Sequence, residues 1–165
     1  MKQEYKSYYN SPVGLIEIDG TENSITQVKF VDESFNTSFE STPYLEICAK
    51  QLDQYFKGER KVFEIVLEPE GTDFQKKVWN ELLNVSFGET KSYLEIADAL
   101  GDPKVIRAAA AANGQNPIAI IIPCHRIIGT DGSLTGYAGG LWRKKWLLNH
   151  EVKFSDGEKQ LELGL

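Results

Sequence analysis

The chain has 165 residues, of which 41% are hydrophobic, and a formal net charge of −6 at pH 7. This length is enough to bury a core in one domain or two small ones without disulfides. It has two cysteines, no apolar leader, and no run near the ~20 apolar residues needed to cross a bilayer, which argues against a secreted, disulfide-rich or membrane protein. We therefore expect a cytoplasmic protein with no membrane contact.

The charge is unevenly distributed along the chain. Residues 1–74 carry 7 basic and 14 acidic side chains, whereas residues 75–150 carry 9 basic and 6 acidic ones. The basic middle allows an anionic partner such as nucleic acid, but an excess this small is not specific for any function.

The first part of the chain has a strand-rich pattern. Short runs of β-branched and aromatic residues, separated by glycine, proline and asparagine, predict four strands over residues 5–9, 14–19, 24–31 and 62–67. This part contains no arrangement of residues typical of catalysis.

A helix is predicted between the third and fourth strands. Thr42 can cap it, Pro43 suits its first turn, and its apolar stripe ends at Gly58. Cys48 lies within that stripe, which favours core packing over any chemical role for this thiol.

From about residue 72 the pattern becomes helical. Thr72 with Gln75, and Ser92 with Glu95, form two capping boxes, each before an apolar stripe at helical spacing. Gly101 ends the second of these helices.

A third helix is predicted from Asp102-Pro103 to residue 114. With the preceding helix and the glycine turn it suggests a helix-turn-helix. Five consecutive alanines, residues 108–112, let another backbone come close to this helix. The residues leave two interpretations open: a helix packed tightly against its neighbours, or a helix pressed into a DNA groove with Arg107 projecting from it.

The apolar run 118–122 leads to Pro123 and then to Cys124 beside His125. A free thiol has a pKa near ~8.5, so little of it is the nucleophilic thiolate at neutral pH. We expect neighbouring groups to lower the pKa of Cys124. His125 is a candidate base, acting through a bridging water because adjacent side chains usually point in different directions.

A third member of such a site follows a helix predicted over residues 141–149. Glu151, just beyond it, could return to His125 and orient it. A cysteine next to a histidine is more often coincidence than catalysis, so spacing alone leaves the triad undecided.

An ordered series of motifs resembles the O6-alkylguanine-DNA alkyltransferases, also called methylated-DNA-protein-cysteine methyltransferases. The resemblance covers the whole second part of the chain and, more loosely, the first. Its motifs are residues 71–79 (GTDFQKKVW), 87–89 (FGE), 92–93 (SY), 103–104 (PK), 107–108 (RA), 116–117 (NP), 121–126 (IIPCHR), 136–140 (GYAGG) and 145–151 (KWLLNHE).

The resemblance implies a fold. Residues 1–71 would form a ribonuclease-H-like α/β domain, a small antiparallel sheet plus a helix, without nuclease chemistry. Residues 72–153 would form a mostly α, winged-helix-like DNA-binding domain with the helix-turn-helix, followed by a frayed tail, residues 154–165.

The resemblance also implies a reaction: irreversible, single-turnover transfer of a methyl or other alkyl group from O6 of guanine, with O4 of thymine as an alternative, to Cys124. The nucleotide would first rotate out of the duplex. His125 would activate the thiol through a water, and Glu151 would hold His125. Tyr93 would crowd the target phosphate and offer its hydroxyl to guanine N3. Asn116 would be the hinge between the groove-binding helix and the active-site segment.

Further residues would contact DNA or line the pocket. Arg107 would fill the space left by the rotated nucleotide, and the main-chain carbonyls of Cys124 and Ile127 would accept from the guanine amino group. The DNA-contacting set is Arg107, Ser92, Tyr93, Ala108, Ala111 and Arg126, and the pocket set is Ile127, Tyr137, Ala138, Gly139 and Ala119. The partner would be double-stranded DNA containing O6-alkylguanine, bound by a monomer, with no cofactor and no metal.

The chain departs from the family pattern at some positions. Ala110 and Ala111 stand where some members have glycine, and the first domain lacks the cysteine and histidine set that holds a structural zinc in some members. Ala119 stands where members that accept benzyl groups have proline, so we expect slow reaction with O6-benzylguanine.

Two rival classes stay open on the residues. One is a base-flipping lesion-recognition or regulatory module without chemistry. The other is a cysteine hydrolase that uses Cys124, His125 and Glu151 on an acyl substrate.

Overall fold

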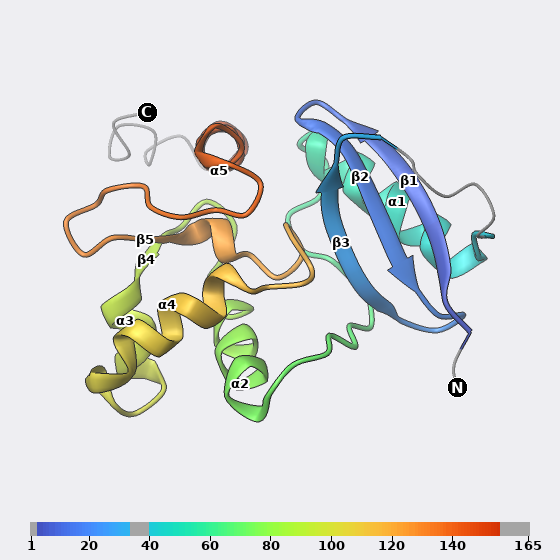
Figure 1. Cartoon of the computed structure of the whole chain (residues 1–165). Coiled ribbons are helices and arrows are strands. Elements are labelled where there is room, and N and C mark those ends of the chain that lie inside the picture. The colour runs from blue at the N-terminus through green and yellow to red at the C-terminus, as the bar shows by residue number, and fades with distance from the viewer. Residues whose placement is uncertain (1–2, 34–39, 156–165) are drawn as a thin grey trace. The chain divides into compact units, whose positions relative to one another are not determined.

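The computed structural model describes residues 3–33 and 40–155 (Figure 1). The chain divides into two compact units, one of residues 1–70 with 117–119 and one of residues 71–116 with 120–165. The predicted domain boundaries stay predictions, because compactness alone does not show that either unit folds by itself. Among the described residues, no helix is long and apolar enough to span a membrane.

The first unit contains a three-stranded antiparallel sheet and one helix. Strands β1 (Tyr5–Ser11), β2 (Gly14–Gly20) and β3 (Ile25–Val31) pair in chain order, and α1 (Pro43–Phe56) contacts β1 and β2. Successive strand residues face opposite sides, so one face gathers the apolar ones. The core contains Ile16, Ile18, Val28, Leu45, Leu52 and Tyr55, all at most 1% exposed. The expected small antiparallel sheet with a helix is confirmed.

Helix α1 begins and ends as its sequence predicts. The Thr42 side chain accepts a hydrogen bond from the Leu45 amide at 3.2 Å, and Pro43 occupies the first turn. Gly58, with φ of 78°, follows the helix end. Cys48 is fully buried on the core side, and burial raises the pKa of its thiol to about 12. Its predicted packing role is confirmed.

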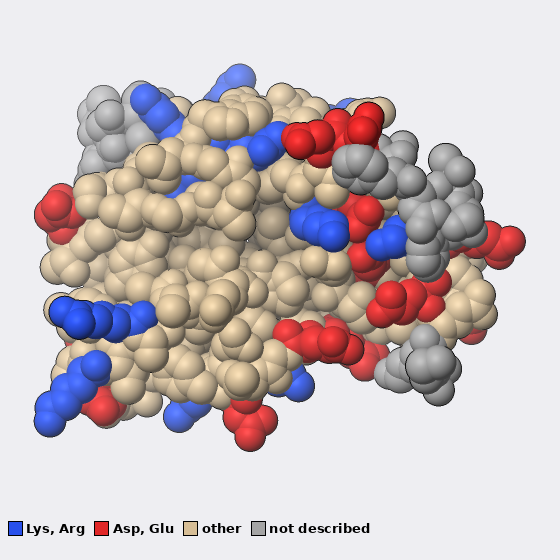
Figure 2. Space-filling view, viewed as in Figure 1, with Lys and Arg blue, Asp and Glu red and all other residues tan. Residues whose placement is uncertain are grey.

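The opposite sheet face carries charged side chains. The Lys6 ammonium contacts Glu17 at 3.3 Å and Asp19 at 3.1 Å, and Lys29 contacts Glu17 at 3.4 Å. Figure 2 shows acidic and basic side chains close together over this sheet.

On the same view, basic side chains project from the surface of the second unit formed by α3 (Tyr93–Ala99) and α4 (Ile106–Gly114).

The predicted strand over residues 62–67 is wrong. Only Leu67 forms a bridge with β3, at Ile25, and Val62 is 71% exposed. The physical reason lies at the edge of β3. Further along it, Val28 already pairs with the returning segment 117–119, through Pro117 O and the Ala119 amide. Residues 62–67 therefore have little free edge to bind.

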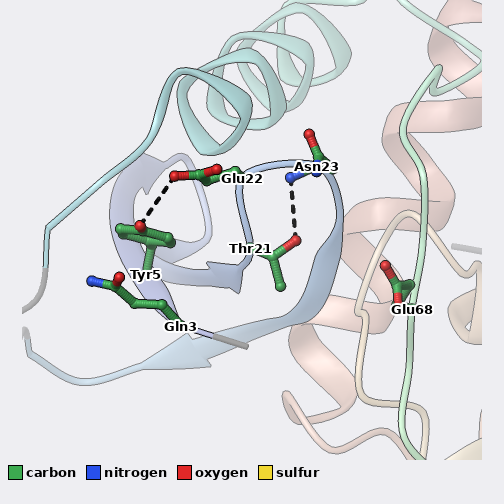
Figure 3. Close-up of a pocket in the computed structure, with 6 residues that line it drawn as sticks. All are labelled: Gln3, Tyr5, Thr21, Glu22, Asn23 and Glu68. Atoms are coloured by element: carbon green, nitrogen blue, oxygen red, sulfur yellow. Dashed lines mark hydrogen bonds between the residues drawn. The ribbon is translucent and has the colours of Figure 1, made fainter. Parts of the chain in front are cut away.

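A pocket of about 370 Å³ opens beside the hairpin end of this unit (Figure 3). Tyr5 donates a hydrogen bond to Glu22, and the Thr21 hydroxyl accepts one from the Asn23 amide. The lining holds no paired nucleophile and base; it consists of Gln3, Tyr5, Thr21, Glu22, Asn23 and Glu68.

The second unit is mostly helical. Helices α2 (Asp73–Leu82) and α3 (Tyr93–Ala99) both begin with complete capping boxes, as predicted. The third predicted helix is not continuous. It starts as a 3₁₀ turn, η1 (Pro103–Val105), capped by Asp102, and continues as α4 (Ile106–Gly114). Val105, with ψ of 14°, separates the two pieces.

Short strands join distant parts of this unit. Strand β4 (Lys91–Ser92) pairs in parallel with β5 (Ile127–Ile128), which directly follows the 3₁₀ turn η2 (Cys124–Arg126). This pairing brings the start of α3 beside the segment that carries Cys124.

The last helix, α5 (Leu141–Phe154), is longer than predicted. The sequence pattern predicts its end at residue 149, but buried positions continue at helical spacing through Leu148, Glu151 and Val152. His150 and Glu151 therefore lie inside the helix. Residues 156–165 of the predicted tail lie outside the described residues.

Candidate active site around Cys124

Cys124 lies on a sharply turned, buried segment. Ile120 has a φ of 71°, a region that β-branched residues rarely adopt, so the chain reverses there at a cost in strain. Pro123, with φ −83° and ψ 60°, then forms a tight turn closed by the Cys124 amide on Ile122 O at 2.8 Å. The proline ring favours this φ, so the residue before the cysteine helps set its orientation. Cys124 is 7% exposed.

The resting thiol is held in its neutral form. Burial raises the pKa of Cys124, while a hydrogen bond from the Asn116 side chain and the charge of Lys144 act in the opposite direction. Desolvation is the larger effect, so the expected lowering of this pKa is not what the structure shows. Formation of the thiolate therefore requires that its proton be taken by another group.

His125 and Glu151 meet inside this unit. His125 Nε2 lies 2.6 Å from Glu151 Oε2, and both side chains are fully buried. Burial lowers the pKa of His125 even though Glu151 opposes the shift. A neutral ring donates from Nε2, because a carboxylate can only accept. Nδ1, buried and without a partner among the described residues, then carries the free lone pair.

Glu151 accepts from three different groups. Besides His125, its oxygens receive Arg126 Nε at 2.7 Å, Arg126 Nη2 at 3.1 Å and the Gly88 amide at 3.2 Å. Burial alone would raise the pKa of Glu151, but His125 and Arg126 outweigh it and hold that pKa well below its usual range. The residue is therefore a carboxylate.

Asn116 connects α4 with the cysteine segment. Its Nδ2 donates to Ile122 O at 2.8 Å, and its side chain also bonds Cys124. One side chain thus holds the turn before the nucleophile and contacts the nucleophile itself.

Tyr93 is the first residue of α3, directly after β4. Its hydroxyl lies 3.4 Å from both Thr135 O and Thr135 Oγ1. The β4–β5 pairing sets Ser92, the residue before Tyr93, beside Ile128, and the Lys144 ammonium lies 6.0 Å from the Tyr93 ring centroid.

Lys144 is a site residue that the sequence analysis missed. Its side chain is fully buried, and Nζ donates to Ile127 O at 2.6 Å and Thr135 O at 2.8 Å. Burial lowers its pKa to about 8, while Cys124 acts in the opposite direction. Helical spacing could have revealed it, because position 144 shares a face with the buried positions 147, 148 and 151.

The predicted pocket loop depends on glycines. Gly136 and Gly140 have φ of 44° and 92°, and the Gly140 amide bonds Tyr137 O at 2.8 Å. Arg143 donates to Gly139 O at 2.9 Å, while Ala138 is exposed. Burial raises the pKa of Tyr137 well above its usual value, and Cys124 adds to the shift, so the Tyr137 hydroxyl lies in electrostatic reach of the thiol.

The carbonyls expected to receive guanine already accept one hydrogen bond each. Cys124 O accepts from the Ile127 amide, and Ile127 O accepts from Lys144. A carbonyl oxygen has two lone pairs, so each keeps one acceptor position.

The predicted DNA-contacting residues fall into two groups. Arg107, Ala108 and Ala111 are exposed on α4, whose opposite side is buried. Arg126 is instead buried, and its guanidinium is turned inward onto Glu151 and Val85 O.

Two further predicted site residues, Ser92 and Ala119, make hydrogen bonds that hold the local backbone in place. The Ser92 hydroxyl accepts from the Glu95 amide at 3.1 Å and so caps α3. Ala119 belongs to the first unit, where its amide bonds Val28 O at 2.9 Å.

Comparison with known proteins assigns both units. Residues 5–69 match the model "6-O-methylguanine DNA methyltransferase, ribonuclease-like domain", and residues 73–153 match "6-O-methylguanine DNA methyltransferase, DNA binding domain". A ribonuclease-like unit joined to a helical DNA-binding unit defines the class as the methylated-DNA–protein-cysteine methyltransferases. More particularly, the chain belongs to the 6-O-methylguanine DNA methyltransferase family. The resemblance read from the motifs, and the fold class it implied, are confirmed.

Individual relatives are similar over nearly their full length. A methylated-DNA–protein-cysteine methyltransferase of Methanosarcina acetivorans is 45% identical over 152 residues, which cover 89% of this chain and 97% of the relative. The crystal structure of Mycobacterium tuberculosis O6-methylguanine methyltransferase has a TM-score of 0.85 at 39% identity, covering 96% and 99% of the two chains. A second structure, of Mycobacterium tuberculosis OGT in complex with DNA, has a TM-score of 0.84 at 41% identity, covering 95% and 98%.

Proposed function

We propose that the chain repairs DNA by direct reversal, transferring a methyl or other alkyl group from O6 of guanine in duplex DNA to the sulfur of Cys124. The observation that carries this is the buried series Cys124, His125, Glu151, in which His125 Nδ1 has no partner and Nε2 lies 2.6 Å from Glu151. The names of the relatives, and the complex of one of them with DNA, support the same reaction.

The proposed chemistry needs a neutral base and a buried thiol. His125 Nδ1 takes the Cys124 proton through a water, and the thiolate attacks the alkyl carbon. The S–C bond forms as the C–O6 bond breaks, and the electron pair of that bond stays on guanine. Tyr93 donates a proton to guanine N3, so the base leaves uncharged. Lys144 stabilises the thiolate by its charge, and Asn116 by its hydrogen bond.

The thioether product is too stable to be reversed, so each molecule reacts once. Residues Ile127, Tyr137, Ala138 and Gly139 form the proposed pocket set within the second unit. The exposed side of α4 is the proposed DNA surface, where alanines at positions 108 and 111 permit close approach and Arg107 fills the stack after the nucleotide rotates out. We place the protein in the cytoplasm, since Cys124 must stay reduced to react. We also propose that it acts as a monomer.

Mass spectrometry tests the reaction. After incubation with a duplex containing O6-methylguanine, we expect a permanent gain of one methyl group on the peptide that holds Cys124, and none in Cys124→Ala. Tight binding without an adduct would instead indicate a recognition module, and turnover of an activated ester beyond one equivalent would indicate a hydrolase.

Arg107→Ala tests the DNA surface. We expect repair of duplex DNA to fall about 10- to 100-fold, equivalent to the few kcal/mol of unstacking that Arg107 offsets, while reaction with free O6-methylguanine base changes little. Gln115→Ala, at an exposed position just after α4, is the matched control. Equal losses on both substrates would contradict the proposed role of Arg107.

A further inference from the structure

The Arg126 side chain is buried, and its guanidinium makes several hydrogen bonds inside the second unit. Its Nε and Nη2 bind the two oxygens of Glu151 at 2.7 and 3.1 Å, and its Nη1 donates to Val85 O at 2.7 Å. The Phe87 ring lies against it, with a centroid distance of 5.8 Å. At 7% exposure, the residue is an internal cation.

Arg126 and His125 share one counter-ion. Glu151 carries a single negative charge, and a guanidinium remains charged over the whole usable pH range. With Arg126 paired to Glu151, a proton added to His125 would create a second positive charge in a buried space that also contains Lys144. Without Arg126, the same proton would turn His125 and Glu151 into a neutral ion pair.

We infer that Arg126 is a positioning residue that neutralises Glu151 and thereby keeps His125 an uncharged base. This inference rests on the proposed function, because it assigns His125 the role of proton acceptor for Cys124. Glu151 orients the ring, and Arg126 prevents the carboxylate from also charging it. The direction of the His125 pKa agrees: burial lowers it, Arg126 and Lys144 lower it further, and Glu151 is the opposing group.

The charged and titratable groups around His125 come from three elements. Arg126 and Cys124 belong to η2, and Glu151 and Lys144 belong to α5. Tyr137 on the pocket loop lies in electrostatic reach of Cys124 and Glu151. Arg126 is the group among these that is both permanently cationic and bound to the carboxylate that faces His125, which is why its removal affects the ring most directly.

The test measures methyl transfer from an O6-methylguanine duplex as a function of pH in the full chain, with Arg126→Gln and Arg126→Lys. Glutamine keeps a donor toward Glu151 but removes the charge. We expect the acid limb of the rate profile to move up by about one pH unit or more in Arg126→Gln. Its rate should be roughly tenfold below that of the wild type near pH 6.5 and should approach the wild-type rate as the pH rises toward 8. Arg126→Lys, which keeps the positive charge, should show the pH–rate profile of the wild-type protein. An equal loss at every pH would overturn the inference.

A second measurement uses the fact that the chain has two histidines, His125 and His150. NMR titration of the two rings should show that His125 is neutral at pH 7 in the wild-type protein. The pKa of His125 should be higher in Arg126→Gln than in the wild type. Should the glutamine variant fail to fold, a charged His125 in the wild-type protein at pH 7 would still overturn the inference. Absence of methyl transfer by the wild-type protein would instead contradict the proposed function, and the titration would still decide the role of Arg126.

Discussion

The two units each bury one free cysteine, and the surroundings of the two thiols differ. Cys48 lies in the apolar core of the first unit, where burial alone raises its pKa to about 12. Cys124 in the second unit is also raised by burial, but Asn116 and Lys144 act against that shift. Burial is therefore common to both thiols, and the difference between them is the pair of neighbouring groups that stabilise a thiolate at Cys124.

The two units also differ in how their charged clusters are exposed to water. Glu17 and Asp19 lie on the charged sheet face, and their cationic partners Lys6 and Lys29 are 18% and 46% exposed. Glu151 is fully enclosed with His125 and Arg126. Water screens the charges of the first cluster but is excluded from the Glu151 cluster. Interactions between charges are therefore much stronger in the Glu151 cluster.

The largest expected effect compares the two thiols directly. Cys124→Ser should abolish methyl transfer, because a hydroxyl at neutral pH is a far weaker nucleophile than a thiolate. Cys48→Ala should react at the wild-type rate and lose only about 1 kcal/mol of stability from reduced packing. Adduct formation by mass spectrometry and denaturant unfolding measure the two effects. Loss of transfer in Cys48→Ala with normal stability would break the contrast.

The next effect compares the two carboxylate clusters. Glu151→Gln should lower the free energy of unfolding by about 3–5 kcal/mol, because it leaves Arg126 buried without its counter-ion. Asp19→Asn should change it by about 1 kcal/mol or less, because its partner is partly exposed. Urea unfolding at pH 7 measures both. Similar losses in the two variants would mean that enclosure does not distinguish the clusters.

The pH dependence of stability follows from the same cluster. The pKa values of Glu151 and His125 are lower in the folded protein than the ordinary 4.5 and 6.5. The unfolded chain therefore binds their protons more readily, and folding loses stability as pH falls. We expect the loss to begin below about pH 6.5 from His125 and to steepen below about pH 4.5 from Glu151. In Glu151→Gln the steeper acid phase should be weaker, as unfolding curves at several pH values would reveal.

A smaller effect concerns Lys144. Lys144→Met should slow methyl transfer about 10- to 100-fold, because a buried charge that stabilises the thiolate is lost. In the wild-type protein the rate should also fall as pH rises through about 8, where the ammonium loses its proton, and this decline should be absent in the variant. Lys145→Met, the exposed neighbour, is the matched control and should stay within about twofold of the wild type. A normal rate in Lys144→Met would remove Lys144 from the mechanism.

The smallest expected effect lies in the segment 117–119, which the first unit takes from the middle of the chain. Ala119→Pro removes the amide that bonds Val28 O, so we expect a loss of about 1 kcal/mol in stability. Ala119→Ser keeps that amide and serves as the control. The proline should also speed reaction with O6-benzylguanine relative to methylated DNA. Wild-type inactivation by O6-benzylguanine as fast as repair of methylated DNA would refute the expected slow reaction.

Local features of the fold follow from neighbouring residues alone. The capping residues Thr42, Thr72 and Ser92 start their helices where predicted, because a cap needs only a side chain and the next three amides. The order of the motifs likewise identified the family, and with it Cys124 as the proposed acceptor.

Which charged groups are enclosed together depends on packing between segments that are far apart in the chain. Residues 62–67 read as a strand, but the edge they needed is occupied by a segment some 50 residues later in the chain, a contact that no local pattern records. The resemblance predicts a DNA contact for Arg126, but its guanidinium binds Glu151, and the sequence does not single out Lys144, whose ammonium is buried and binds Ile127 O. Burial and long-range pairing set the pKa values of this site, and both depend on the packing of α5 against η2.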